Sequence, residues 1–368
     1  MTPEIESDFA AEVRRFLGEH WPIPPFRAVP AAVWEAAAGR WFAALYRRGW
    51  SVPAWPEAHG GAGWSLEQRF TWERAVVLAQ APVMDPVGVG LVGPLIQAHG
   101  GGTLCERYLD DIRAARSHWA AGLTGLSMDD AGLRASPSGA DYVLRGTLTG
   151  ITGLGRATHA LCLGAMDGGG LGLFAVSMEA AGVGHVDAQS LAFADASADL
   201  LSPPGGGLDA LNAALCGEQA PLAVTASAEA QLARIKMDLA ATADGRGGFL
   251  DSDADFRRRL AHLEVGLRSL QALEARSLAD RSASKERLGT GGAKADLLAL
   301  GSADLERELG ELRIDVAGYY ALAQQDPTLS ANEGPIGPGY ASPPIEGMLE
   351  PFWALDAHRR RLTARVMG

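Results

Sequence analysis

The glycine-rich stretch from Gly88 to Gly93 has the residue types and spacing that most directly suggest ligand chemistry. It fits the GxGxxG pattern of dinucleotide-binding loops, and Asp110 follows near the distance expected of an acid that binds a ribose. That pattern binds a pyrophosphate only when a strand precedes it and a helix follows. Here an alanine-rich helical pattern with Pro82 and Pro86 comes first, and Pro94 closes the stretch. We therefore interpret these glycines as small residues that let helices pack closely.

Other chemical motifs are missing from the sequence. It holds no HExxH zinc motif, no GxSxG nucleophile elbow and no Walker loop, and its eight histidines are scattered singly. Cys105, Cys162 and Cys216 are far apart and include no CxxC pair, so neither a disulfide framework nor a zinc cage is indicated. We expect no bound metal and a reducing compartment. The acidic first residues also lack the pattern of a secretory signal, which favours the cytoplasm.

The composition is that of a folded, acidic protein. The 368 residues are 47% hydrophobic and 21% charged, and the formal net charge is -12. A chain of this length holds roughly two or three domains of about 150 residues each. Because negative charge repels phosphate backbones, we do not expect nucleic acid as a partner. The longest apolar window, residues 76–98, is interrupted by prolines and Asp85, so we expect no membrane span either.

The hydrophobic periodicity changes twice along the chain. Up to about residue 116 it is helical, and a helix from about residue 65 to 80 starts with a capping-box pattern formed by Ser65 and Gln68. Short strand-forming runs follow, and the pair Asp167-Gly168 predicts a hairpin turn between two of them. Helical spacing then returns and persists. One apolar stripe is formed by Phe256, Leu260, Leu263, Leu267, Leu270 and Leu273, and another by Leu305, Leu309, Leu312 and Val316.

These changes predict an α+β fold with three parts. We expect an N-terminal α-helical domain at residues 1–117, a middle β domain at residues 118–204 and a C-terminal α-helical domain at residues 205–368. The run of prolines and glycines from Pro203 to Gly207 supports the second boundary. Helices as regular as those of the last part indicate a bundle.

The stretch from Val52 to Glu67 contains the ordered pattern P-x-W-P-x-x-x-G-G-x-G-x-S. It resembles the N-terminal helical domain of the acyl-CoA dehydrogenase family. Further landmarks of that family follow in order: Gly93 to Gly101, Arg107 to Leu109, Trp119, and Tyr142 to Gly146. Segments in the C-terminal part resemble a subgroup found in bacterial steroid side-chain breakdown: Phe256 to Arg281, Gly318 to Leu322, and Asn332 to Pro338.

The resemblance implies the α-β-α fold of that family and an FAD-dependent oxidation of the α,β bond of an acyl-CoA. In this reaction a carboxylate removes a proton from Cα while a hydride leaves Cβ for the flavin. It also implies an electron-accepting flavoprotein as a partner. The flavin contacts that the resemblance implies here are Leu123, Thr124, Ser127, Gly150, Thr152 and Arg246.

The cofactor-facing motifs nevertheless depart from the family pattern. The segment T/S-E-P-x-A-G-S-D is replaced by residues 124–130, of which only Thr124 matches. In the segment G-x-K-x-W-x-T the tryptophan has become Gly150, although Thr152 is retained. The R-x-x-F-G segment, which in the family reaches the cofactor diphosphate across the subunit interface, is shortened to Arg246 to Phe249.

The resemblance points to Glu218 as the candidate catalytic base. The C-terminal tyrosine-glutamate motif of the family is absent, with Phe352 near its place, but some members carry the base in an L-x-x-E-R context. Residues Leu215 to Gln219 match that context except for Gln219 in place of arginine. The alternative is that Glu218 is a surface acid in the first turn of a helix, where the helix dipole favours it. Glu346 and Glu350 lie near the other base position without its motif.

Three hypotheses follow. The leading one is that the chain is the cofactor-poor subunit of a heteromeric, α2β2-type acyl-CoA dehydrogenase that acts on a bulky, steroid-derived acyl-CoA. The second is a self-sufficient homomeric dehydrogenase that uses Glu218, with the flavin held largely by backbone groups around residues 123–127 and Thr152. The third is a catalytically inactive interaction protein with this fold.

Overall fold

The computed structural model describes residues 3–26, 29–123, 132–139, 141–216, 221–283 and 293–318. The chain forms two compact units. One comprises Met1–Trp41, Trp64–Val83 and Pro221–Gly368, and the other comprises Phe42–Gly63 and Met84–Ala220. The predicted boundaries after residues 117 and 204 divide the chain by secondary structure instead, and they stay a prediction.

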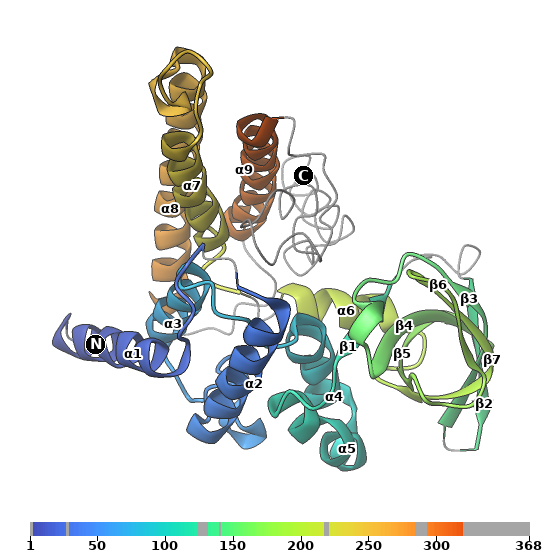
Figure 1. The fold of residues 1–368 in the computed structure, drawn as a ribbon. Coiled ribbons are helices and arrows are strands. Elements are labelled where there is room, and N and C mark those ends of the chain that lie inside the picture. The colour runs from blue at the N-terminus through green and yellow to red at the C-terminus, as the bar shows by residue number, and fades with distance from the viewer. Residues whose placement is uncertain are drawn as a thin grey trace. The chain divides into compact units, whose positions relative to one another are not determined.

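The second unit contains a mixed sheet that closes on itself. Strand β4 pairs with β2 on one side and β5 on the other, and β2–β3, β3–β7 and β7–β5 complete the ring, as Figure 1 shows. Strand β1 adds beside β4, and β6 adds beside β7. The strands are β1 Trp119–Gly122, β2 Leu133–Ser138, β3 Asp141–Leu148, β4 His159–Met166, β5 Leu171–Ser177, β6 Val183–Asp187 and β7 Ser190–Leu200.

The interior of this barrel accounts for the strand-forming runs of the sequence. Leu133, Leu144, Leu148 and Phe174 are buried together inside it. The predicted hairpin at Asp167-Gly168 is confirmed, because it joins the antiparallel strands β4 and β5. The two glycines that follow have φ of +90° and +78°, a left-handed conformation that glycine adopts without steric cost.

The remaining elements of the second unit are helical. They are η1 Glu57–His59, the π-helical turn η2 Gly88–Val92, α4 Gly93–His99, α5 Gly101–Arg113, η3 Leu154–Arg156 and α6 Gly207–Cys216. Helix α5 is attached to the sheet, because Arg107 forms an ion pair of 2.6 Å with Asp199 of β7 and the Tyr108 hydroxyl donates to the same carboxylate.

The GxGxxG stretch forms that π-helical turn and runs into α4, so it lacks the strand that a dinucleotide-binding loop requires. A Cβ built on Gly88 would lie 2.9 Å from Cδ1 of Trp119, and one on Gly93 would lie 2.1 Å from Cζ2 of Trp55. The interpretation as close-packing residues is confirmed for Gly88 and Gly93, whereas a Cβ on Gly90 would meet no atom within 4 Å.

The first unit is helical. Its elements are α1 Pro3–His20, α3 Leu66–Leu78, α7 Ala226–Ala241, η4 Leu250–Ser252, α8 Ala254–Ala283 and α9 Ala293–Ala317, and α2 Ala31–Arg48 begins in it. The predicted capping box is confirmed, since the Ser65 side chain accepts from the backbone of Gln68 and the Gln68 side chain accepts from that of Ser65. Trp50, which continues the helical spacing of α2, lies beyond its end because Gly49 adopts φ of +75°.

The predicted leucine stripes are confirmed as the core of a bundle of α7, α8 and α9, which lie side by side in Figure 1. Leu263 and Leu267 of α8 are buried together with Leu309 and Leu312 of α9. A second core lies nearer the N-terminus, where the fully buried Trp41 stacks on Trp72 at 6.0 Å between ring centroids. The Trp41 indole N–H also donates to the carbonyl of Pro82 at 2.9 Å.

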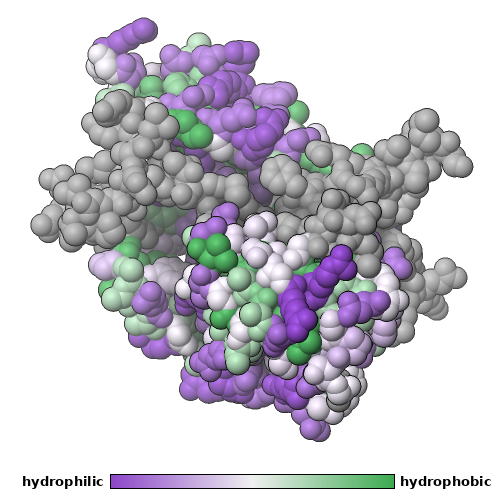
Figure 2. All heavy atoms as spheres, turned by 90° about the vertical axis from the view of Figure 1, so that its right-hand side faces the viewer, coloured by the Kyte–Doolittle hydropathy of each residue, from purple (hydrophilic) through white to green (hydrophobic). Residues whose placement is uncertain are grey.

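The surface shows no sign of a membrane-spanning helix. Among the described residues, no helix has both the length and the apolar character needed to cross a bilayer. In the view of Figure 2, the hydrophobic residues form small, separate patches among hydrophilic ones.

Candidate functional site

The signature segment that begins at Val52 is organised around one indole ring. Trp55 is buried, and its indole N–H donates to the carbonyl of Val89 in the π-helical turn at 2.9 Å. Gly93 packs against the face of this ring, and a Cβ on Gly61 would lie only 1.7 Å from the carbonyl oxygen of Trp55. Any larger residue at either glycine would have to displace the tryptophan or its backbone.

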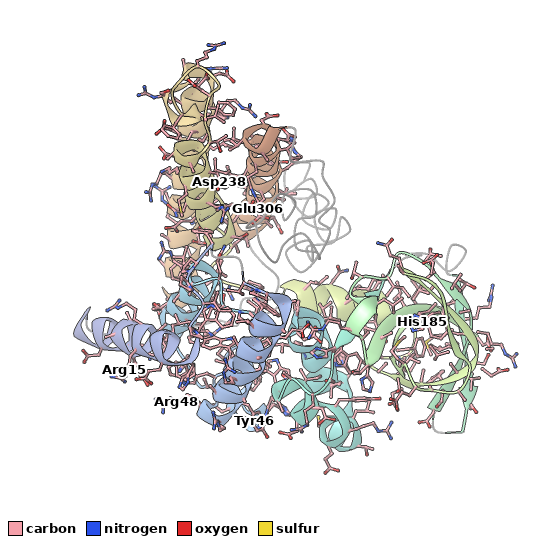
Figure 3. The ribbon with its side chains drawn as sticks, in the orientation of Figure 1. Arg15, Tyr46, Arg48, His185, Asp238 and Glu306 are labelled. Carbon is pink, nitrogen blue, oxygen red and sulfur yellow. The ribbon has the colours of Figure 1, made fainter. Side chains whose placement is uncertain are left out.

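A second glycine of the signature packs against an arginine. A Cβ on Gly60 would lie 1.8 Å from Nη1 of Arg113, and Gly60 itself has φ of +90°. The Arg113 guanidinium lies 5.3 Å from the ring of Tyr46, which is labelled in Figure 3, and the Tyr46 hydroxyl donates to Asp110 at 2.9 Å. The signature residues therefore hold the loop and helices together.

The flavin-facing candidates near the barrel lie on two segments that the fold brings together. Leu123 follows strand β1 and is buried, while Gly150 and Thr152 lie in the turn after β3. Thr152 and Ala121 exchange both backbone hydrogen bonds, each 3.0 Å long. This pairing holds Leu123 close to Thr152. Such proximity is expected if both residues contact one flavin, as the resemblance implies.

The backbone of this turn is already used internally. The N–H of Ile151 donates to the carbonyl of Gln189 at 2.9 Å, and the N–H of Thr152 donates to Ala121. The Thr152 hydroxyl lies 3.5 Å from the carbonyl of Ala121, a long contact that leaves it available to another partner.

The position of the family's tryptophan is occupied by a residue that needs to be glycine. Gly150 has φ of +68°, a conformation that costs a residue with a side chain about 1–2 kcal/mol. No aromatic residue occurs between Gly146 and Leu154. The hydroxyl groups of this stretch are those of Thr147, Thr149 and Thr152, and the N–H groups of Ile151 and Thr152 are bonded within the protein.

Arg246 lies in the other compact unit, at the tip of a tight loop. The bridge between Ala243 and Phe249 closes the loop, and the Asp244 carboxylate accepts from the N–H of Arg246 at 2.7 Å and of Gly248 at 2.9 Å. These backbone donors hold the pKa of Asp244 below its usual value. These hydrogen bonds fix the shape of the loop, and Arg246 at its tip is exposed.

Thr124, Ser127 and Glu218 lie outside the described residues, as do Glu346 and Glu350. The segment that follows Glu218 in the sequence is firmly attached. The Glu73 carboxylate accepts from the N–H of Leu222 at 2.6 Å, and Glu274 accepts from both the N–H and the hydroxyl of Thr225 at 2.8 Å. Burial raises the pKa of Glu274, and the bonds from Thr225 oppose that shift.

Sequence reasoning missed these two acids, and it also missed Asp85. The Asp85 carboxylate accepts from the N–H of Trp119 at 2.7 Å and of Val87 at 3.1 Å, so it joins the π-helical turn to the first strand. Burial raises its pKa to about 6. In the sequence, Asp85 stands out only as an acid within an apolar run. This pattern does not reveal which N–H groups donate to its carboxylate.

No protein-family model matches the sequence, and no curated protein matches it. Solved structures match it along almost its whole length. The steroid acyl-CoA dehydrogenase Tcur3481-Tcur3483 has a TM-score of 0.73 with 17% identity, over 100% of this chain and 98% of that one. The ChsE4-ChsE5 complex from Mycobacterium tuberculosis has a TM-score of 0.65 with 19% identity, over 95% and 97% of the two chains.

A glutaryl-CoA dehydrogenase from Mycobacterium smegmatis in complex with FADH2 is also similar, with a TM-score of 0.61 and 18% identity over 91% of this chain and 92% of that one. This chain has the acyl-CoA dehydrogenase fold. The fold predicted from the signature segment is therefore confirmed. In this acyl-CoA dehydrogenase fold, the signature packing around Trp55 is intact, whereas the turn at Gly150 differs from the family pattern.

Proposed function

We propose that this chain is a subunit of a heteromeric, FAD-dependent acyl-CoA dehydrogenase that oxidises the α,β bond of a bulky, steroid-derived acyl-CoA. A homologous subunit supplies most flavin contacts and the base, and a flavoprotein accepts the electrons in the cytoplasm. The fold supports the reaction class. The similarity to a steroid acyl-CoA dehydrogenase and to the ChsE4-ChsE5 complex supports the substrate class and the partner.

The turn at Gly150 carries the proposal. The left-handed backbone at Gly150 disfavours the flavin-facing aromatic residue, and the N–H groups of Ile151 and Thr152 are paired within the protein. A stacking surface and hydrogen-bond donors hold a flavin ring, and this turn offers neither an aromatic ring nor an unpaired N–H at Ile151 or Thr152. Loss of them in an otherwise intact fold fits a subunit that completes a site built mainly by its partner.

α,β-Dehydrogenation requires a carboxylate that removes the Cα proton and a flavin that accepts the hydride. Within the complex, this chain contributes Arg246. Its guanidinium lies on an ordered loop. Because a guanidinium can donate two parallel hydrogen bonds to a pair of phosphate oxygens, Arg246 can bind the diphosphate of a cofactor held by the partner. Thr152 contributes its hydroxyl as a hydrogen-bonding group for the same cofactor.

Flavin content tests the proposal. The chain is purified alone and after coexpression with a homologous subunit that carries intact cofactor motifs, and bound FAD is measured by absorbance. We expect no FAD in the lone chain and one FAD per pair of unlike subunits in a co-purifying complex. One FAD in each lone chain would contradict the proposal and favour the homomeric enzyme.

The self-sufficient dehydrogenase remains the second candidate, because the segment after Glu218 is held by Glu73 and Glu274 as a catalytic loop would need. Glu218→Gln should then abolish turnover. The matched control is Asp209→Asn, which removes an exposed acid from the preceding helix α6. Unchanged turnover in Glu218→Gln would exclude that base. An inactive interaction protein would reduce no acceptor with any acyl-CoA, alone or with a partner.

A further inference from the structure

A groove between α3 and α8 in the first unit has no part in the proposed dehydrogenase function. Its volume is about 380 Å³, within the range of small-molecule pockets. Phe70, Ala275 and Leu278 give it an apolar floor, and the small alanine side chain leaves the space between the helices open.

The two helices run antiparallel along the groove, so its ends are chemically different. At one end, Ser282 of α8 donates to Glu67 at the start of α3. At the other end, Arg74 of α3 and Gln271 of α8 both bind Glu229, at 2.7 and 3.1 Å. The groove therefore has an acidic end at Glu67 and a basic end near Arg74.

The basic end contains one cation whose charge is not neutralised. Arg74 pairs with both oxygens of Glu229. Arg268, which is exposed, donates to the amide oxygen of Gln271 at 2.9 Å, and no carboxylate of the described residues lies within ion-pair distance of it. A guanidinium has five donors, so most of those of Arg268 are available to an anion.

The acids of the groove set the direction of a ligand. Both oxygens of Glu274 already accept from Thr225 on the neighbouring helix, and Glu67 lies at the opposite end. An anionic head group is therefore attracted to Arg268 and repelled from the Glu67 end. An apolar tail attached to it would lie over Ala275 and Leu278.

We propose that this groove binds an organic carboxylate with an apolar tail. The carboxylate binds Arg268, and the tail runs along α8 towards Leu278, a span of about 15 Å at the rise of an α-helix. None of the candidate flavin contacts that the structure describes lines this groove.

Decanoate is the probe, titrated below its micelle concentration into the full chain without cofactor and followed by calorimetry. We expect saturable binding at one site. Decanol and decyltrimethylammonium have the same tail without the anion, and they should bind at least about tenfold more weakly. Equal binding of the three, or no saturable binding of decanoate, would overturn the proposal.

Two variants test the two ends of the ligand. Arg268→Gln should weaken decanoate about tenfold by removing the charge-assisted hydrogen bonds. Ala275→Leu should block the tail and abolish binding. The matched controls are Arg276→Gln and Ala272→Leu, which change exposed residues of the same helix outside the groove and should leave binding unchanged. Unchanged affinity in both groove variants would show that decanoate binds elsewhere. These experiments measure decanoate binding and not turnover. A negative result would therefore overturn the groove proposal without contradicting the dehydrogenase proposal.

Discussion

The signature segment around Trp55 and the turn around Gly150 belong to the same compact unit, but they differ in how they relate to the family pattern. The signature keeps every patterned residue, and its glycines pack against Arg113, the Trp55 carbonyl and the Glu57 side chain. The turn has lost its aromatic residue and uses its N–H groups internally. The residues that pack the signature thus follow the family pattern, whereas the turn that the resemblance implies lies beside the flavin departs from it.

The largest effect should come from Gly61→Ala. The new methyl group would lie 1.7 Å from the carbonyl oxygen of Trp55, and a backbone atom cannot move aside without disturbing the indole. We expect a loss of at least about 3 kcal/mol in the free energy of unfolding, measured by urea denaturation.

The control for that variant is Gly102→Ala in α5, where the added methyl group meets no atom within 4 Å. It should stabilise the helix by about 0.5–1 kcal/mol. Similar destabilisation by both variants would remove the structural role assigned to the signature glycines.

Asp85 links the two regions, since it binds the turn that contacts Trp55 and the strand that leads to Leu123. Its pKa of about 6 in the folded state exceeds the value of 3.8 in the unfolded chain. The folded state therefore binds the proton more tightly, so this group adds stability that is complete below pH 3.8 and is lost as the pH rises through 6. The full increment is about 3 kcal/mol.

Asp85→Asn should remove this dependence. The difference in unfolding free energy between wild type and variant should change by about 2.4 kcal/mol as the pH rises from 4 to 7. Asp244→Asn is the control, because the pKa of Asp244 is lowered and its stabilisation is lost only in acid below pH 3.8. A pH-independent difference for Asp85→Asn would show that this carboxylate is not desolvated.

Gly150→Trp tests whether the family residue alone restores the cofactor site. The left-handed backbone should cost the variant about 1–2 kcal/mol of stability. The lone chain should still bind no FAD, because the N–H groups of Ile151 and Thr152 stay paired. Stoichiometric FAD in the purified variant, seen by absorbance, would mean that the missing ring was the only defect.

The smallest effect is expected at the end of the signature, where Ser65 caps α3. Ser65→Ala should cost about 1 kcal/mol, because it leaves the N–H of Gln68 without its acceptor. Ser65→Asp keeps an acceptor and should retain most of the stability. Thermal unfolding of the two variants checks this, and equal melting temperatures would show that the cap contributes nothing.

Local patterns predicted much of this fold correctly. The capping box at Ser65, the hairpin at Asp167-Gly168 and the leucine stripes of α8 and α9 each depend on residues a few positions apart. The order of helices, strands and helices follows from the same periodicities. The predictions of the candidate site could be checked less fully. Thr124, Ser127 and Glu218 lie outside the described residues, so their roles stay predictions.

The sequence by itself determined the helical and strand periods, the acidic charge and the signature that indicates this fold. Only the tertiary structure decided that the GxGxxG stretch is a π-helical turn, that Gly150 adopts a left-handed conformation, and that Glu73 and Asp85 serve as acceptors. Glu73 binds Leu222, 149 residues away, and Asp85 binds Trp119, 34 residues away. A buried carboxylate is stable only beside its donors, and donors so distant along the chain are brought to it by packing of the whole unit.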